Sequence, residues 1–288
     1  AAKDEIERLD ALLSTGNEKS EIGQLNKNKK GQISADTQYL LNRSFTIYEE
    51  TDGAFDITIY PVMRAWGFTG EEHRIPSEEE LQSLLQLVDA SSLQYDASTQ
   101  TLTLPEGVEI DFGGIAKGYT SQRVAQIMQE YDINSAILNL GGNVQLVGAK
   151  PDGSSWKVAI KSPDEQEEYL GVLSAQNKAI ITSGGYERYF EENGRKYHHI
   201  IDPKTGMPAY NGLQSVTIVS EDGTLADGLS TALYVMGTES AVKFWQNHND
   251  EFDAILYTDD GNLYVTEGIA DTFTSSHSIT VLEKAVAF

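Results

Sequence analysis

Helix-like and strand-like segments follow one another along this chain without a fixed alternation. Apolar residues recur at helical spacing in six segments, at residues 4–13, 34–50, 77–87, 116–131, 225–236 and 239–247. Short runs typical of strands lie at 101–104, 108–112, 136–140, 156–161, 170–175, 178–182, 197–201, 215–220, 254–257 and 263–266. Because these segments do not repeat as strand–helix–strand units, they favour an α+β fold over a doubly wound parallel sheet.

Turn residues predict two hairpins. Pro105-Glu-Gly separates the strand-like runs at 101–104 and 108–112, and Asp260-Gly261 separates those at 254–257 and 263–266. No fixed-period repeat and no low-complexity linker divides the chain. We therefore expect residues 1–288 to form a single domain.

The balance of charge excludes several classes of partner. The chain has 44 Asp plus Glu against 21 Lys plus Arg, a formal net charge of -23. Such a surface repels nucleic acid and anionic lipid. An anionic small molecule would need a local exception, such as a bound cation or a helix N-terminus.

The sequence lacks both cysteine and a long apolar run, which restricts the possible chemistry and the possible location of the protein. With no cysteine, the chain has no disulfide, no thiolate metal site and no cysteine nucleophile. No run approaches the roughly 18 apolar residues of a membrane span. The sequence opens in a helical pattern, A-A-K-D-E-I-E-R-L-D, without a signal peptide. We expect a mature or truncated form of an exported protein or, equally, a cytosolic one.

The stretch D-F-G-G-I-A-K-G-Y-T at 111–120 has the glycines of a phosphate loop but not their order. It matches neither G-x-x-x-x-G-K-[ST] nor G-x-G-x-x-G. One interpretation is a plain turn from strand to helix, in which glycine permits close backbone approach. The other is a ligand site, with Asp111 at the end of a strand and Lys117 as a positive charge in the first helical turn.

Asp227 and Thr231, in A-D-G-L-S-T-A-L, lie four residues apart and therefore on one helix face. A carboxylate and a hydroxyl suit a hard cation such as Mg²⁺. The alternative is structural, because Asp is favoured in a first helical turn and Thr often bonds to the carbonyl four residues earlier.

Other candidate residues are aromatic or imidazole groups. In Y-H-H-I-I-D, adjacent strand residues face opposite ways, so at most one of the two histidines serves a site as general base. Phe55, Tyr60, Trp66 and Phe68 form either plain core or the wall of a ring-binding pocket.

Taken in order, six motifs resemble the ApbE family over about residues 4–270. They are T-x-G-A-F-D-I-T…W-G-F, D-F-G-G-I-A-K-G-Y, L-N-L-G-G-N, T-S-G-x-Y-E-R, H-I-I-D-P-K-T-G and A-D-G-L-S-T-A-L-Y-V-M-G. The resemblance implies one compact unit of mixed sheets and helices related to the T-fold. It implies a Mg²⁺-dependent FAD:protein FMN transferase, which moves FMN from FAD onto a Thr or Ser hydroxyl of an acceptor flavoprotein subunit and releases AMP. This flavinylation is a post-translational modification.

The resemblance also implies roles for individual residues. The metal ligands would be Asp227, Thr231 and the main-chain carbonyl of Gly114, with Ala116 as the alternative carbonyl. His199 or Asp227 would accept the proton of the incoming hydroxyl. The residues expected to bind the FAD substrate are Ala54, Phe55, Asp56, Asp111, Lys117, His199 and Ile200.

The chain departs from the family pattern at two places. A strand with a Met-Gly motif usually precedes the first helix and helps to build the FAD pocket, so its absence predicts weaker FAD binding. Gly185 stands where many relatives carry Asp. Family acceptors are often membrane-bound or exported redox subunits. We therefore expect an extracytoplasmic lipoprotein whose anchoring Cys lies upstream of this sequence.

Three other functions stay open. Water in place of the acceptor hydroxyl would make the protein a Mg²⁺-dependent FAD pyrophosphatase that yields FMN and AMP. A non-enzymatic FAD-binding protein would keep the ligand intact. An acidic carbohydrate-active enzyme would need two opposed carboxylates in a cleft, and the sequence singles out no such pair.

Overall fold

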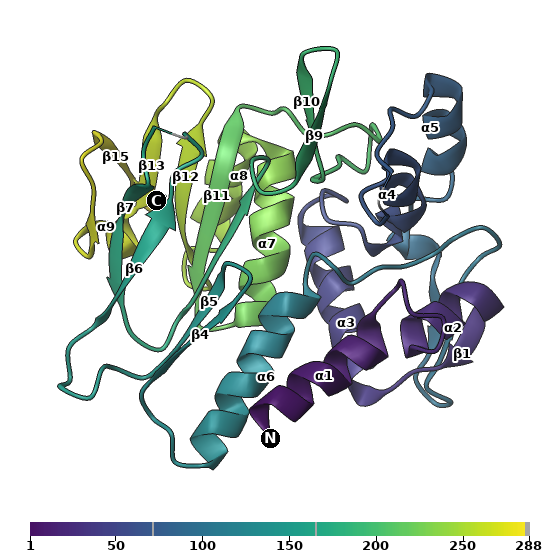
Figure 1. Ribbon diagram of the computed structural model, residues 1–288, viewed down its shortest axis with the longest axis horizontal. Helices are drawn as coiled ribbons and strands as arrows, with labels where there is room; N and C mark the ends of the chain where they lie inside the picture. The colour runs from purple at the N-terminus through teal and green to yellow at the C-terminus, as the bar shows by residue number, and fades with distance from the viewer. Residues whose placement is uncertain (71, 165, 286–288) are drawn as a thin grey trace.

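A seven-stranded sheet crosses the molecule, and its central strands come from the second half of the chain (Figure 1). The computed structural model describes residues 1–70, 72–164 and 166–285. The strand order is β15 (Ile279–Leu282), β13 (Leu263–Thr266), β12 (Asp253–Thr258), β11 (Leu213–Ser220), β8 (Ala179–Gly184), β5 (Asn143–Val147) and β4 (Ala136–Leu140). Neighbours pair antiparallel except β13 and β15, which are parallel.

Helices cover one face of this sheet and a second sheet covers the other. On the first face lie α6 (Ala116–Glu130), α7 (Gly223–Met236) and α8 (Thr238–Asn247). Alternate strand residues such as Ile181 and Ile218 pack there with Leu229 of α7. The other face meets β6 (Trp156–Lys161), β7 (Tyr169–Ala175), β14 (Phe273–Thr274) and the short helix α9 (Glu267–Ala270). Both faces of the central strands are therefore buried, as their apolar runs require.

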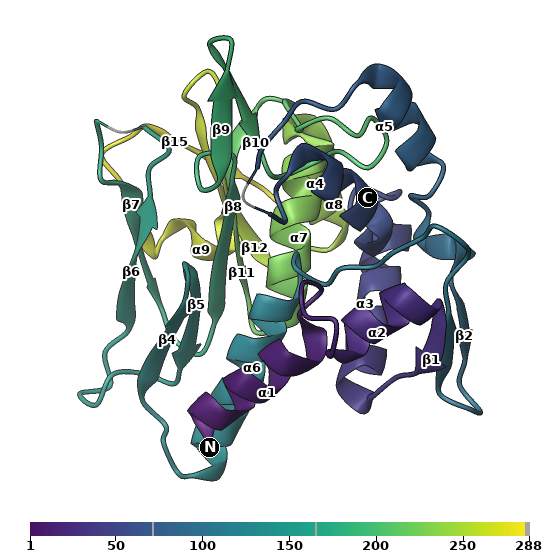
Figure 2. The ribbon, with the colours of Figure 1, turned by 45° about the vertical axis from the view of Figure 1, so that its right-hand side comes forward.

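The first 110 residues form a mostly helical part beside α6 and α7 (Figure 2). Its helices are α1 (Ala2–Leu13), α2 (Glu21–Asn28), α3 (Ala35–Glu50), α4 (Tyr60–Trp66), α5 (Glu78–Leu85) and the short 3₁₀ segments η1 (Ile57–Ile59) and η2 (Ala90–Ser92). Ser20, Ser34 and Ser77 each accept the N–H three residues on, which is why α2, α3 and α5 begin there. A small sheet has the order β1 (Lys30–Gln32), β3 (Thr101–Thr103), β2 (Gln94–Asp96).

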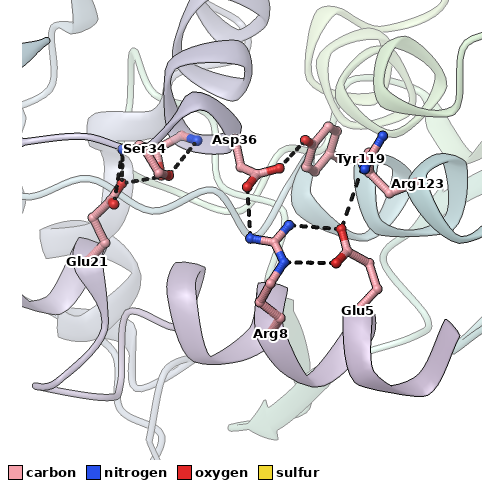
Figure 3. A network of polar contacts seen from close by, with 8 residues as sticks. Glu5, Arg8, Glu21, Ser34, Asp36, Tyr119 and Arg123 are labelled. Atoms are coloured by element: carbon pink, nitrogen blue, oxygen red, sulfur yellow. Dashed lines mark hydrogen bonds and ion pairs between the residues drawn. The ribbon is translucent and has the colours of Figure 1, made fainter. Parts of the chain in front are cut away.

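A polar network ties α1 to α3 and α6 (Figure 3). The Arg8 guanidinium donates to Glu5 at 2.8 Å and to Asp36 at 2.9 Å. Asp36 also accepts the hydroxyl hydrogen of Tyr119, and Arg123 lies 3.7 Å from Glu5. Since Tyr119 and Arg123 belong to α6, the network fixes that helix against the N-terminal helices.

The prediction of a hairpin at 101–112 is wrong. β3 pairs with β1 and β2 instead, and the described residues 108–112 form no strand. The side chain of Asn26 replaces the missing ladder bonds, because it donates to the carbonyl of Ile110 and accepts the Ile110 N–H, both at 2.8 Å. Val108, Ile110 and Phe112 are buried, so an apolar extended segment packs in the core without strand pairing.

The strands predicted at 136–140, 156–161 and 263–266 have the predicted bounds, and the remaining predicted elements outside 101–112 occur with shifted ends. The hairpin around Asp260-Gly261 is confirmed as β12 and β13. The strand predicted at 197–201 ends at His198, as β10 (Arg195–His198), and pairs with β9 (Tyr189–Glu192). Mixed sheets and helices confirm the α+β class. None of the helices in the described ranges is both long and apolar enough to cross a membrane.

Candidate functional site

A cavity lies where the start of α6, the middle of α7 and the segment 54–59 meet residues at the base of the β9–β10 hairpin. It encloses about 1090 Å³ of empty space, counting its open mouth. The structure brings ten of the predicted site residues to its wall: Ala54, Phe55, Asp56, Asp111, Gly114, Lys117, His199, Ile200, Asp227 and Thr231.

Asp227 is the point at which three elements of the cavity meet. The side chain belongs to α7 and the residue is only 6% exposed. Its carboxylate accepts the backbone N–H of Gly118 in α6 at 2.7 Å and the side-chain amide of Asn143 in β5 at 3.1 Å. Burial raises the pKa of this carboxyl to about 6. The two neutral donors orient this buried carboxylate, and the positive charge of Lys117 acts on it against the effect of burial.

Glycine at 118 is required by the approach of α6 to α7. A Cβ at this position would lie 2.1 Å from the carbonyl oxygen of Gly223 and 2.6 Å from the Cβ of Asp227. The Gly118 N–H points to Asp227 rather than to the carbonyl of Gly114, four residues back. Within the described ranges, the Gly114 carbonyl accepts no hydrogen bond. It is therefore left available to a ligand.

The oxygens beside Asp227 fit a hard cation. Thr231 lies one turn further along α7, with its hydroxyl 3.3 Å from that of Ser183. The Gly114 carbonyl has no hydrogen-bond partner among the residues that the structure describes. Oxygen donors of this kind suit Mg²⁺, which keeps several waters and takes few carboxylates. Ala116 fits less well, because its carbonyl already accepts the Thr120 hydroxyl at 2.7 Å and it does not line the cavity.

The set contains one carboxylate, so it is not a metal cage of charged side chains. No group of three or more His, Cys, Asp or Glu able to hold a metal occurs in residues 1–70, 72–164 and 166–285. A cation at Asp227 would complete its shell with hydroxyl, carbonyl, water and ligand oxygens. Such a site binds the metal most firmly together with an anionic ligand.

Positive charge is available for an anion at the same wall. Lys117 is exposed and makes no ion pair with any residue that the structure describes. It stands in the first turn of α6, where the helix dipole adds to its charge. Arg188 also lines the cavity and donates to the carbonyl of Phe68. These two cations share the cavity wall with the carboxyl groups of Asp56, Asp111, Glu187 and Asp227.

The structure separates the two adjacent histidines. His198 is buried, with Nε2 3.0 Å from the carbonyl of Ala209, and lies outside the cavity wall. His199 lines the cavity, with Nδ1 3.1 Å from the carbonyl of Arg188. Burial, together with the charge of Arg188, lowers the pKa of His199 to about 4. The ring is neutral at pH 7, and its contact to a carbonyl assigns the proton to Nδ1, which leaves the Nε2 lone pair free.

Two predicted ligand carboxylates hold the protein's own backbone. Asp56 accepts the N–H and the hydroxyl of Thr58 at 2.7 and 2.6 Å, and the N–H of Ala90 at 3.2 Å. Asp111 accepts the hydroxyl of Thr15 and the N–H of Gly113, both at 2.9 Å. Burial raises the pKa of both carboxyls. These contacts fix the cavity wall, whatever further contact each makes with a ligand.

Of the four aromatic residues that the sequence assigned either to the core or to a pocket wall, one lines the cavity and three lie in the core. Phe55 lines the cavity, and a Cβ at Gly114 would lie 2.9 Å from its ring. Trp66 and Phe68 pack instead with Tyr197 in a separate core cluster, and the Trp66 indole donates to the carbonyl of Gly206 at 2.7 Å. Tyr60 is also buried away from the wall.

Residue-level prediction missed several wall residues, above all Asn143, Ser183 and Glu187. Each lies in a motif that the sequence singled out, but none had a spacing that indicated its role. Asn143 follows the strand β4 by a glycine turn, and its contact with Asp227 spans 84 positions. Burial raises the pKa of Glu187 against the opposing charges of Lys117 and Lys161.

The sequence pattern of the ApbE family matches residues 1–256. A curated relative from Haemophilus influenzae, named FAD:protein FMN transferase, is 32% identical over 267 residues, which cover 89% of this chain and 77% of that protein. A relative of the same name from Vibrio cholerae is 33% identical over 263 residues, covering 89% and 78%.

Solved structures share the fold as well. The ApbE protein of Thermotoga maritima has a TM-score of 0.87 at 34% identity, covering 93% of this chain and 88% of that one. The flavin transferase ApbE of Vibrio cholerae has a TM-score of 0.84 at 29% identity, covering 94% and 88%. Motifs, fold and cavity agree with this match, and the chain belongs to the ApbE family.

Proposed function

We propose that the protein is an FAD:protein FMN transferase, which transfers FMN from FAD to a Thr or Ser hydroxyl of an acceptor flavoprotein subunit and releases AMP. The observation that carries the proposal is the setting of Asp227. Its carboxylate is buried and oriented by Gly118 and Asn143, in the same cavity wall as Gly114, whose carbonyl accepts no hydrogen bond from the described residues. The names of the curated relatives support the same activity.

Asp227, Thr231 and Gly114 would hold Mg²⁺. The ion would supply a Lewis acid that neutralises the diphosphate and the departing AMP. Lys117 and the amides that open α6 add positive charge toward the same phosphates. This arrangement lets a chain of net charge -23 accept an anionic dinucleotide.

The reaction needs one proton acceptor, and His199 fits this role better than Asp227. The hydroxyl oxygen of the acceptor forms a bond to the FMN phosphorus, the P–O bond to AMP breaks, and AMP leaves with the electron pair. The hydroxyl proton goes to Nε2 of His199, whose Nδ1 is held by the Arg188 carbonyl. Both Asp227 oxygens already accept hydrogen bonds, and this leaves them less free for a proton.

We also infer that the enzyme works outside the cytoplasm, tethered by a lipid anchor. The support is the resemblance alone, since acceptors of the ApbE family are often membrane-bound or exported redox subunits. Fractionation of source cells with an antibody to this chain tests the inference. Signal in the membrane fraction on the extracytoplasmic side supports it, and signal in the cytosol overturns it.

The activity is tested by incubation with FAD, Mg²⁺ and a candidate flavoprotein subunit, followed by mass spectrometry of the subunit. A mass gain of FMN on a threonine or serine supports transfer. Free FMN and AMP without an adduct would show the pyrophosphatase instead, and intact bound FAD would show a flavin-binding protein. Omission of Mg²⁺ is the control for metal dependence.

A further inference from the structure

We propose that the open edge of β4 docks an extended segment of the acceptor polypeptide, which adds to the large sheet as one more strand. The inference rests on the proposed function and names how its protein substrate is held. β4 (Ala136–Leu140) ends the seven-stranded sheet beside α6 (Figure 1, Figure 2). Among the described residues its only strand partner is β5.

The pairing register shows which backbone groups of β4 are free. Leu146 of β5 donates its N–H to the carbonyl of Lys178, on the far side of β5 from β4. Its partner in β4 is Ile137, so the pair Ile137–Leu146 exchanges no ladder bonds. By alternation, the N–H and C=O groups of Ile137 and Asn139 point away from the sheet. No described residue forms a hydrogen bond to these groups.

Two side chains of β4 are exposed, the apolar Ile137 and the polar Asn139, and the other three are half-buried. Ile137 is 43% exposed although Leu146, directly opposite, is fully buried. The second sheet covers Leu146 and does not reach Ile137. Residues 133–143, I-N-S-A-I-L-N-L-G-G-N, contain no charged residue. An incoming strand would therefore meet free backbone groups and an uncharged surface together.

Another free edge of the molecule is guarded. β6 is the last strand of the second sheet and carries the exposed Lys157 and Lys161. Lysine on an edge strand is a common device against strand addition. β4 carries no lysine or arginine, although the chain has 21 basic residues. The opposite edge strand of the large sheet, β15, also lacks lysine, but of these two strands only β4 leads directly into a residue of the cavity wall, Asn143.

The position of β4 identifies the partner as the acceptor. The strand runs through Gly141 and Gly142, with φ of +60° and +99°, into Asn143, whose amide binds Asp227. A Cβ at Gly142 would lie 3.9 Å from the carboxylate of Glu187 at the cavity wall. An added strand that passes Leu140 advances about 3.3 Å per residue toward the cavity mouth. It would bring a hydroxyl-bearing residue to the site.

The probe is the peptide of about twelve residues around the threonine or serine that mass spectrometry finds flavinylated. It is compared with a copy N-methylated at alternate backbone amides, which cannot donate to an edge strand. With FAD and Mg²⁺, we expect the N-methylated copy to lose at least about tenfold in transfer rate. Equal rates for the two peptides would overturn the proposal.

Variants of the enzyme give a second readout. Ile137→Pro removes a backbone N–H that points away from the sheet and leaves the hydrogen bonds to β5 in place. Ile137→Lys places a lysine on the edge strand, as β6 has. Both should raise the KM for the acceptor about tenfold and leave FAD binding, followed by flavin fluorescence, unchanged. Val281→Lys is the matched control, because Val281 is 46% exposed on the opposite edge strand β15. We expect it to behave as wild type.

The outcomes separate this proposal from the proposed function. If no acceptor gains FMN from the unaltered enzyme, the transferase activity itself is wrong. If transfer proceeds with an unchanged acceptor KM in Ile137→Lys, the edge does not dock the acceptor. If that variant instead converts a dimer to a monomer with normal transfer, the edge pairs two copies of this chain, and the proposal is overturned.

Discussion

The backbone N–H of Gly118 donates to the carboxylate of Asp227 at 2.7 Å, across the contact between α6 and α7. This bond replaces the helical bond that Gly118 would otherwise give to Gly114. One contact thus orients the buried carboxylate and frees a carbonyl for a ligand. The glycine-rich stretch at 111–120 therefore acts through helix packing and an exposed carbonyl, which explains why it follows no known phosphate-loop order.

Gly118→Ala should destabilise the fold. The new methyl group would lie 2.1 Å from the Gly223 carbonyl oxygen, so α6 and α7 must separate. Overpacking of this kind typically costs about 1–3 kcal/mol. Thermal unfolding measures the loss, and Gly16→Ala is the control because its Cβ would meet nothing within 4 Å. An unchanged Tm for Gly118→Ala would show that the two helices tolerate a wider approach.

Asn143→Ala should lower the affinity for Mg²⁺ more than it lowers the stability of the fold. The substitution removes the amide that orients Asp227 from β5. Groups that orient a metal ligand typically contribute about 10–100-fold in metal affinity or activity. Titration of transfer rate against Mg²⁺ concentration measures the shift, with the exposed Asn28→Ala as control. A normal Mg²⁺ titration in Asn143→Ala would place the metal away from Asp227.

His199→Gln should lower kcat by about 10²–10⁴-fold, since it removes the proton acceptor. His198→Gln, away from the cavity, should lower stability more than kcat. Single-turnover transfer measures the first effect and thermal unfolding the second. If His198→Gln lowers kcat more than His199→Gln does, His198 rather than His199 is the catalytic base.

The pH profile of transfer distinguishes the two candidate bases. The pKa of His199 is lowered to about 4, so the ring stays neutral and active as pH falls, until pH approaches that value. We expect a nearly constant kcat/KM between pH 5.5 and pH 8. Burial raises the pKa of Asp227 to about 6 in the absence of metal. A loss of activity as pH falls within that range would contradict His199 as the base.

Arg8→Gln should reduce stability near neutral pH by about 1 kcal/mol or less, because the pairs that it breaks are partly exposed. The hydrogen bond from Arg8 lowers the pKa of Glu5. For Asp36, burial is the largest single effect and raises the pKa, but the hydrogen bonds from Arg8 and Tyr119 and the charges of Arg8 and Arg123 together outweigh it, so the pKa is lowered. Carboxyls with depressed pKa values stabilise the fold above their usual pKa near 4, and this contribution is lost as pH falls further.

Urea denaturation at pH 6 and pH 3 measures this difference. The destabilisation caused by Arg8→Gln should be present at pH 6 and should shrink at pH 3. Lys3→Gln, which removes an exposed pair 3.4 Å from Glu7, is the control and should change little at either pH. A destabilisation that is equal at both values would mean that Arg8 acts through packing of its stem.

Local signals predicted much of this fold. Apolar residues at helical spacing located α3 and α5, and the turn at Asp260-Gly261 located the β12–β13 hairpin. The failures came from distant contacts. Residues 108–112 look like a strand, but the Asn26 side chain satisfies Ile110 from 84 positions away. No local pattern carries that information.

The site shows the same division. Asp227 and Thr231 share a helix face, so their spacing alone placed them together. Asn143 and Ser183 join them only because β5 and β8 are neighbours in the sheet. The acceptor-facing role that we infer for Ile137 depends on register, which the sequence of β4 does not disclose. Whether residues 1–288 form a single domain stays a prediction.

Asp227→Asn tests the central claim most directly. The variant keeps the size of the side chain, and rotation of the Asn143 amide can restore the hydrogen bond between them. Acceptor subunit incubated with FAD and Mg²⁺ is weighed by mass spectrometry, with Tm as the check on folding. We expect the wild-type enzyme to add FMN to the acceptor and the folded variant to add none. An FMN adduct formed by Asp227→Asn at the wild-type rate would contradict the account.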